Sequence, residues 1–216
     1  MRWAFWGVVW ILFLIYFVRV VTFENYYYNS KEGSERAVAA VVMEEEELIE
    51  EKPAEAEVLE YKVAADRPRY LTIEKLKVNK ARVIAVGVKT NGELGTPNNI
   101  FDVGWYDASG KPGQGGTMLI DGHNGGPHVH GVFKDLPKLV AGDIITIERG
   151  DGVIYNYSVV ENLEISLDEA DSYMATAMRS PEKDKESITL ITCSGEWSAV
   201  RKTYLSRQFV RATLQI

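Results

Sequence analysis

The sequence predicts an all-β domain, either a barrel or a sandwich, over residues 67–216. Short runs rich in β-branched residues follow one another through this region, and Gly, Pro, Asn and Asp lie between them. Such a succession of strands and turns is typical of closed or two-layered β folds. The runs cover residues 69–78, 81–88, 116–123, 143–150, 153–165, 187–193 and 206–216.

One helix is expected between these strands, at residues 166–178, "SLDEADSYMATAM". Ser166 can cap its N-terminus, and Glu169 stands at the capping-box spacing. A second short helix could form over residues 97–105, "PNNIFDVGW". The sequence shows no internal repeat and no glycine-rich phosphate loop.

The N-terminal residues 1–23 form an apolar and aromatic run that only Arg2 and Arg19 interrupt. About 20 residues span a bilayer, so the run suffices if Arg19 reaches the interface. A cleavable signal peptide would need a small-residue cleavage site after the run, and none is present. We therefore expect an uncleaved single-pass anchor in the cell membrane, with the remainder of the chain outside the cytoplasm.

Charge separates a linker from the domain. Residues 24–66 contain 13 acidic and four basic residues, whereas residues 67–216 contain 18 of each. Like charges repel along the first segment, which is expected to be an extended or partly helical acidic stalk. The neutral domain offers no basic face, so nucleic acid is not an expected partner.

Cys193 is the only cysteine of the chain. Exported proteins use cysteine mostly in disulfide pairs, and a single cysteine cannot pair within its own chain. It is therefore an intermolecular link, an inert buried residue or a reactive thiol.

A reactive thiol needs a histidine to move protons and a donor to stabilise an oxyanion. The three histidines all lie between two expected strands, and His123 directly ends the first of them. Cys193 also ends a run, so the two side chains can meet at one mouth of a barrel. His128 and His130 fit better as exposed loop residues.

An arginine is a suitable third member, because a fixed guanidinium can donate to a carbonyl or an oxyanion. Arg207 opens the last expected strand, and Arg211 shares its face because the two are an even number of residues apart. Arg201 lies in the loop between the cysteine and that strand.

These residues carry a resemblance to the sortases. "TLITC" (189–193) matches the TLxTC signature, "GH" (122–123) ends a strand upstream, and Arg207 opens the final strand. Sortases are exported, membrane-anchored cysteine transpeptidases of mainly Gram-positive bacteria. The resemblance covers residues 67–216. It leaves the subclass unassigned, nearest to classes D, E and F, and the lack of a class C lid argues against a pilin polymerase.

The resemblance implies a closed eight-stranded β-barrel with one or two short helices. It implies that Cys193 attacks the Thr–Gly bond of an LPxTG-like sorting signal, that His123 transfers the protons and that Arg207 binds the substrate and the oxyanion. The acceptor would be an amine of a cell-wall precursor or of peptidoglycan, and no cofactor or metal is expected. The further residues expected to contact substrate, or in one case to orient His123, are Leu190, Thr192, Asn124 and Ser194.

Other interpretations remain open at this stage. The three histidines could bind a metal, although no acidic or thiol partner stands near them in sequence. Acidic loops at 166–171 and 181–186 could bind calcium but lack a ligand pattern. An L,D-transpeptidase also uses Cys and His, in a different motif from "TLITC". A membrane-tethered β-fold binding module would use no catalysis at all.

Overall fold

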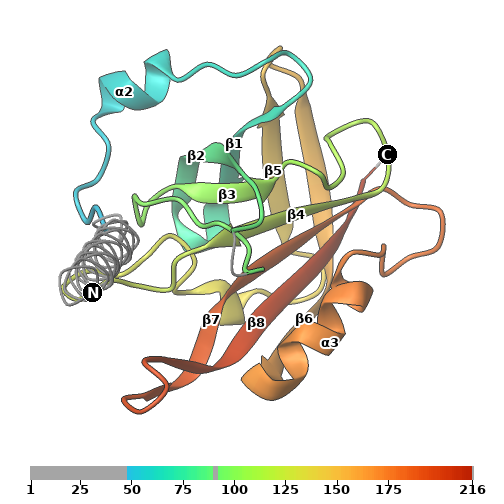
Figure 1. Cartoon of the computed structure of the whole chain (residues 1–216). Coiled ribbons are helices and arrows are strands. Elements are labelled where there is room, and N and C mark those ends of the chain that lie inside the picture. The colour runs from blue at the N-terminus through green and yellow to red at the C-terminus, as the bar shows by residue number, and fades with distance from the viewer. Residues whose placement is uncertain (1–47, 90–91, 216) are drawn as a thin grey trace, which may run out of the picture. The chain divides into compact units, whose positions relative to one another are not determined.

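Eight strands close into a barrel in the order β1-β2-β3-β4-β7-β8-β6-β5 (Figure 1). The computed structural model describes residues 48–89 and 92–215. The all-β class and the closed eight-stranded barrel are therefore confirmed. The strands are β1 (Pro68–Ile73), β2 (Val78–Val86), β3 (Val103–Tyr106), β4 (Thr117–Gly122), β5 (Ile144–Arg149), β6 (Ile154–Ser166), β7 (Ser187–Ser198) and β8 (Thr203–Leu214).

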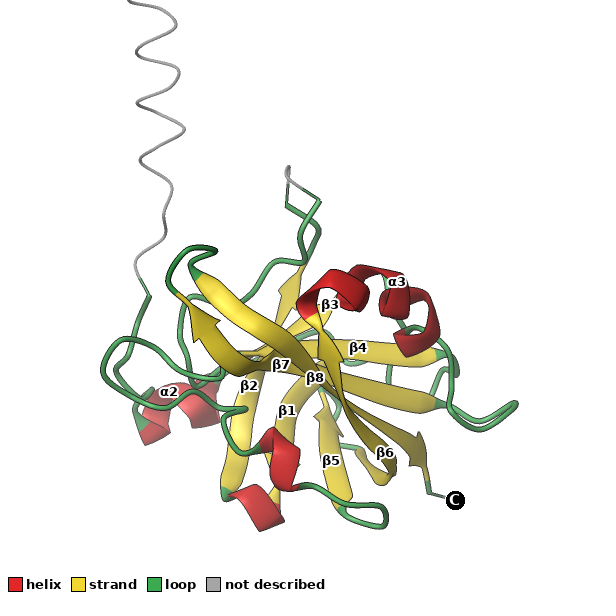
Figure 2. Cartoon of the chain, turned by 90° about the horizontal axis from the view of Figure 1, so that it is seen from below, coloured by secondary structure: helices red, strands yellow, loops and turns green. Residues whose placement is uncertain are grey.

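Two of the neighbouring strand pairs are parallel, β2 with β3 and β4 with β7. The other pairs are antiparallel, including the long pair β7–β8 (Figure 2). The parallel pair β4–β7 aligns Asp121 with Ile191, although 70 residues separate them in sequence. This pair brings the end of β4 next to the middle of β7, where the histidine and the cysteine lie.

Alternation along the strands gives the barrel an inner and an outer apolar cluster. The inner cluster contains Met118, Ile120 and Leu190, all almost fully buried. The outer cluster contains Leu119 of β4, Ile191 of β7 and Phe209 of β8, and helix α3 (Leu167–Ala177) packs over it. Each buried side chain of this size stabilises the fold by roughly 1.5–3 kcal/mol.

Helix α3 confirms the helix expected at 166–178, with one difference at its start. Ser166 stands at the N-cap, but its Oγ donates to Glu169 Oε2 at 2.7 Å and makes no hydrogen bond to the helix backbone. The second expected helix, at 97–105, is not formed. A turn occupies its first half, and Val103–Tyr106 becomes strand β3 because β2 and β4 bind it on both sides.

Three short helical segments complete the structure. They are α2 (Glu55–Glu60) and the 3₁₀ turns η1 (Glu74–Leu76) and η2 (Leu136–Lys138). No helix among the described residues is long and apolar enough to cross a membrane. The expected anchor at 1–23 and the first part of the acidic stalk, 24–47, lie outside the described residues.

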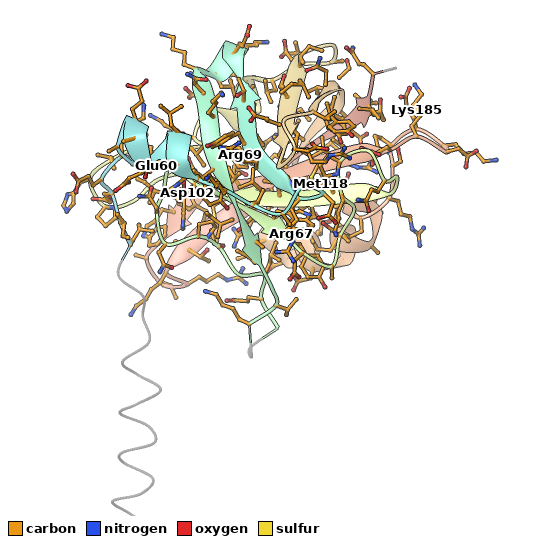
Figure 3. The ribbon with its side chains drawn as sticks, turned by 90° about the horizontal axis from the view of Figure 1, so that it is seen from above. Glu60, Arg67, Arg69, Asp102, Met118 and Lys185 are labelled. Carbon is orange, nitrogen blue, oxygen red and sulfur yellow. The ribbon has the colours of Figure 1, made fainter. Side chains whose placement is uncertain are left out.

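Residues 48–66, which the charge pattern places in the acidic stalk, lie against the barrel. Tyr61 Oη donates to the Val83 carbonyl at 2.7 Å, and Arg69 Nε donates to the Tyr61 carbonyl at 2.8 Å. Figure 3 labels Glu60 of α2 and Arg69 of β1 on this face. The hydrogen bonds of Tyr61 thus hold a segment whose glutamates favour solvent. Residues 48–66 belong to the same compact unit as the barrel.

Candidate active site

Cys193 lies on the outer face of β7, on the same side as Ile191 of the outer cluster. Its direct partner across the antiparallel β7–β8 pair is Arg207. On the other side, the parallel register pairs Asp121 with Ile191. On that side β4 ends at Gly122, and His123 follows it directly, two residues after Asp121. The fold therefore pairs the cysteine directly with the arginine and ends the neighbouring strand β4 just before the histidine.

His123 follows β4 directly and has a defined backbone partner. Its Nε2 lies 2.8 Å from the carbonyl oxygen of Pro97, in the loop between β2 and β3. A carbonyl can only accept a hydrogen bond, so Nε2 carries a proton and donates it. The exchangeable proton of the imidazole is therefore the one on Nδ1, which fixes the nitrogen available for acid–base chemistry.

The thiol of Cys193 is partly buried, and three effects act on its acidity. Burial raises the pKa of Cys193 above its usual value, the positive charge of Arg207 lowers it, and the negative charge of Asp121 raises it again. Burial is the largest of the three. The thiol is therefore mostly protonated at neutral pH, and the thiolate that acts as nucleophile is the minor form.

The guanidinium of Arg207 is held by the β7–β8 hairpin itself. Nη1 donates to the carbonyls of Tyr204 and Ser206 at 3.1 and 2.9 Å. Both carbonyls belong to β8 itself, within its pairing with β7, and the positive charge acts on Cys193 across that pair. A guanidinium held in this way can donate its remaining N–H groups to a substrate carbonyl or an oxyanion.

Partly exposed apolar side chains pack against the outer cluster, whose member Ile191 lies two residues before Cys193 on the same face of β7. They come from three separate parts of the chain, which are the β2–β3 loop, β3 and α3. Such a surface can bind apolar side chains of an extended peptide. The side chains are Leu94, Tyr106, Tyr173 and Met174.

Two residues expected to bind substrate lie inside the barrel. Leu190 is fully buried in the inner cluster. Thr192 is also buried, and its Oγ1 donates to the Gly122 carbonyl at 2.7 Å. This bond ties β7 to the end of β4 just before His123. Side chains alternate along a strand, so the neighbours of Cys193 point away from its face.

The other two residues named in advance are Ser194 and Asn124. Ser194 is buried, and its Oγ has no hydrogen-bond partner within the described part of the chain. Asn124 accepts a hydrogen bond from Gly131 N at 2.8 Å through its backbone carbonyl. The group that orients His123 is the Pro97 carbonyl, which sequence reasoning missed because a backbone oxygen leaves no sequence signal.

The remaining candidates have structural partners. Arg201 forms an exposed ion pair with Asp168 of α3 at 2.8 Å. Arg211 is buried on the same face as Arg207 and bonds Glu161 of β6. His130 bonds Lys134. Residues 48–89 and 92–215 contain no group of three or more His, Cys, Asp or Glu that could hold a metal.

A closed barrel that carries a thiol opposite a guanidinium, with an imidazole after the neighbouring strand, has the groups that a cysteine-dependent enzyme uses. The sortase domain family matches residues 71–215, and the chain belongs to this family of cysteine transpeptidases. No curated protein is significantly similar to the chain in sequence.

Among solved structures, several sortases share the fold. SrtA sortase from Actinomyces oris is 18% identical with a TM-score of 0.52, over 80% of this chain and 87% of that one. Sortase C from Streptococcus pneumoniae is 18% identical with a TM-score of 0.51, over 77% and 75%. Sortase C1 of GBS pilus island 1 is 18% identical with a TM-score of 0.50, over 72% and 67%. At such identities the similarity concerns the fold alone.

Proposed function

We propose that this sortase cleaves an LPxTG-like sorting signal between Thr and Gly and transfers the protein to an amine of the cell wall. Cys193 is the nucleophile, His123 the acid and base, and Arg207 the group that stabilises the oxyanion. The observation that carries this proposal is the strand pairing around Cys193. Arg207 is its direct partner on β8, and His123 directly follows β4, the strand that pairs with β7 on the other side.

The first half of the reaction forms a thioester. The Cys193 sulfur bonds to the threonine carbonyl carbon, and the developing oxyanion accepts hydrogen bonds from Arg207. The C–N bond to glycine then breaks. His123 Nδ1 delivers to the leaving amine the proton that came from the thiol, so that the charges balance.

The second half transfers the acyl group. The acceptor amine attacks the thioester carbonyl, His123 Nδ1 removes the amine proton, and the C–S bond breaks to return the thiol. A thioester reacts with amines more readily than the starting amide does, so one hard exchange becomes two easier steps.

Substrate recognition in this proposal uses the apolar side chains that pack against the outer cluster. The leucine and proline of the signal would pack against Leu94, Tyr106 and Tyr173, which are only partly buried. The predicted anchor at 1–23 would hold the enzyme at the outer surface of the cell membrane, where its substrates and the acceptor amine are. The support for this location is the apolar N-terminal sequence.

The test is a reaction of the full chain in detergent with a small library of LPxTG-like peptides, with and without an amine acceptor. We expect cleavage after Thr, a thioester adduct of peptide mass on Cys193 and a product that requires the amine, all detected by mass spectrometry. The Cys193→Ala variant should give none of them. Cleavage without an adduct, or cleavage that persists in this variant, would contradict the proposal.

A further inference from the structure

Asp121 is a partly buried acid on the face of the barrel that carries Cys193 and Arg207. It lies on β4 two residues before His123, so both side chains project to the outer side. Its Oδ2 lies 2.6 Å from Thr96 Oγ1, and its Oδ1 is buried without a hydrogen-bond partner in the described part of the chain. A buried carboxyl with only one partner is costly, and such groups cluster at functional sites.

Neighbouring residues are shaped to accommodate this carboxyl. Its partner across the β3–β4 pair is Gly104, and a Cβ atom there would lie 2.2 Å from Asp121 Oδ1. The absence of a side chain at Gly104 therefore leaves room for the Asp121 carboxyl. Thr96, which bonds the other oxygen, directly precedes Pro97, whose carbonyl orients His123. One acid thus anchors the loop that holds the histidine.

The charge of Asp121 also reaches the nucleophile. The titratable or charged groups around Asp121 are Lys89 from the loop after β2, His123 after β4 and Cys193 from β7. Arg207 of β8 lies beyond the cysteine, and the partner of Asp121 on β3 is the uncharged Gly104. Burial raises the pKa of Asp121 to about 7, and the Thr96 hydroxyl and Lys89 lower it less strongly. The carboxyl therefore ionises in the neutral range, at a lower pH than the Cys193 thiol, whose own pKa is raised.

We propose that Asp121 is a positioning residue of the active site, which holds the Pro97 loop through Thr96 and opposes the thiolate of Cys193 when it is ionised. Below neutral pH the acid is protonated and only orients the loop. Above neutral pH its negative charge adds to the effect of burial and raises the pKa of the Cys193 thiol further, so the titrations of the two groups are coupled. The proposal rests on the proposed function only in taking Cys193 and His123 as the reacting pair.

The test follows alkylation of Cys193 by iodoacetamide from pH 5 to pH 10 in the full chain in detergent. Asp121→Asn keeps an oxygen for Thr96 but removes the charge. We expect its profile to shift to lower pH, with an alkylation rate about three- to tenfold above wild type at pH 8 and equal to it at pH 5, which corresponds to about half to one pK unit. Asp121→Ala, a second charge-free variant, should shift in the same direction.

Two controls separate charge from structure. Asp168→Asn removes an exposed acid on α3 that pairs with Arg201, and its profile should coincide with wild type. Thr96→Val keeps the charge of Asp121, so its alkylation midpoint should not move to lower pH, whereas its peptide turnover should fall. Folded Asp121 variants whose profiles superimpose on wild type would overturn the proposal. Alkylation needs no peptide, so this result stays distinct from a failure to find a sorting signal.

Discussion

Cys193 and Arg207 are direct partners across the β7–β8 pair, and the guanidinium lowers the pKa of a thiol that burial raises. The arginine is itself fixed by the carbonyls of Tyr204 and Ser206. One short stretch of β8 therefore supplies both a charge for the thiolate and a donor for the oxyanion. These two roles can be separated experimentally, because a lysine keeps the charge but loses the fork of N–H donors.

Replacing Arg207 by alanine should slow peptide cleavage by about 10²–10³-fold, the usual effect of losing one oxyanion donor. It should also move the alkylation profile of Cys193 to higher pH, because the cation that lowers the thiol pKa is gone. Arg207→Lys should restore the alkylation profile but only part of the turnover. Arg201→Ala, at an exposed ion pair, is the matched control. Cleavage by Arg207→Ala at the wild-type rate would contradict the assignment.

Arg211 should act on α3 and on substrate binding. Its Nη2 donates to the carbonyls of Thr176 and Arg179 at 3.1 and 2.8 Å, and its Nη1 bonds Glu161. Arg211→Met leaves these groups unpaired and should cost about 3 kcal/mol of unfolding free energy, measured in urea. Because α3 covers the outer cluster, KM should rise more than kcat falls.

Thr189→Val is a milder substitution that tests the same end of α3 as Arg211→Met. It removes a single hydrogen bond from Thr189 Oγ1 to the Ala177 carbonyl, 2.7 Å long, at the same end of α3. The loss should be about 1 kcal/mol, with a smaller rise in KM. If both variants lowered kcat alone and left KM unchanged, α3 would have no part in substrate binding.

Strand patterns and rare residue types predict the all-β class and single out Cys193, His123 and Arg207, whereas the closed eight-stranded barrel follows from the sortase resemblance. His123 directly follows β4, as the sequence suggests. Cys193 and Arg207, expected at the end of one run and the start of another, lie within longer strands, because β7 continues to Ser198 and β8 begins at Thr203. Strand alternation alone predicts that Leu190 and Thr192 point into the barrel, since only the odd-numbered positions of β7 share the face of Cys193. A TLxTC motif alone does not show which of its residues face inward.

Other features could not be read from the sequence, because they depend on contacts between distant backbone groups. The carbonyl of Pro97 has no signature in the chain, although it orients the histidine. Residues 48–66 are acidic and look like solvated linker, yet Tyr61 and the backbone near Ile49 bind the barrel. The sequence "LIDGH" shows Asp121, but it does not show that Gly104 and Thr96 enclose the carboxyl.

Glu50 should support the loop that follows His123. Its Oε1 accepts a hydrogen bond from His128 N at 3.0 Å, while Ile49 exchanges backbone hydrogen bonds with Asn98 and Ile100 beside Pro97. Glu50→Ala should lower kcat a few-fold and cost roughly 0.5–1.5 kcal/mol of stability. Glu51→Ala is the control, because Glu51 contributes only its carbonyl, to Asn99 Nδ2. Equal kcat values in the two variants would show that the N-terminal segment does not act on the histidine loop.

The stability of the protein should fall as the pH rises from about 4 to about 7, and Asp121 should account for part of that fall. Burial raises its pKa from 3.8 to about 7, so the folded state holds this proton more tightly than the unfolded chain. The stabilisation is complete below about pH 4 and is lost up to about pH 7, because the unfolded chain binds fewer protons in this interval.

Asp121→Asn should remove this dependence. Measured by urea unfolding, its free energy of unfolding relative to wild type should be higher at pH 8 than at pH 5. Thr96→Val should extend this fall to higher pH, since the carboxylate then loses a hydroxyl donor that lowers its pKa. Parallel pH profiles for wild type and Asp121→Asn would mean that the carboxyl is solvated in the folded protein.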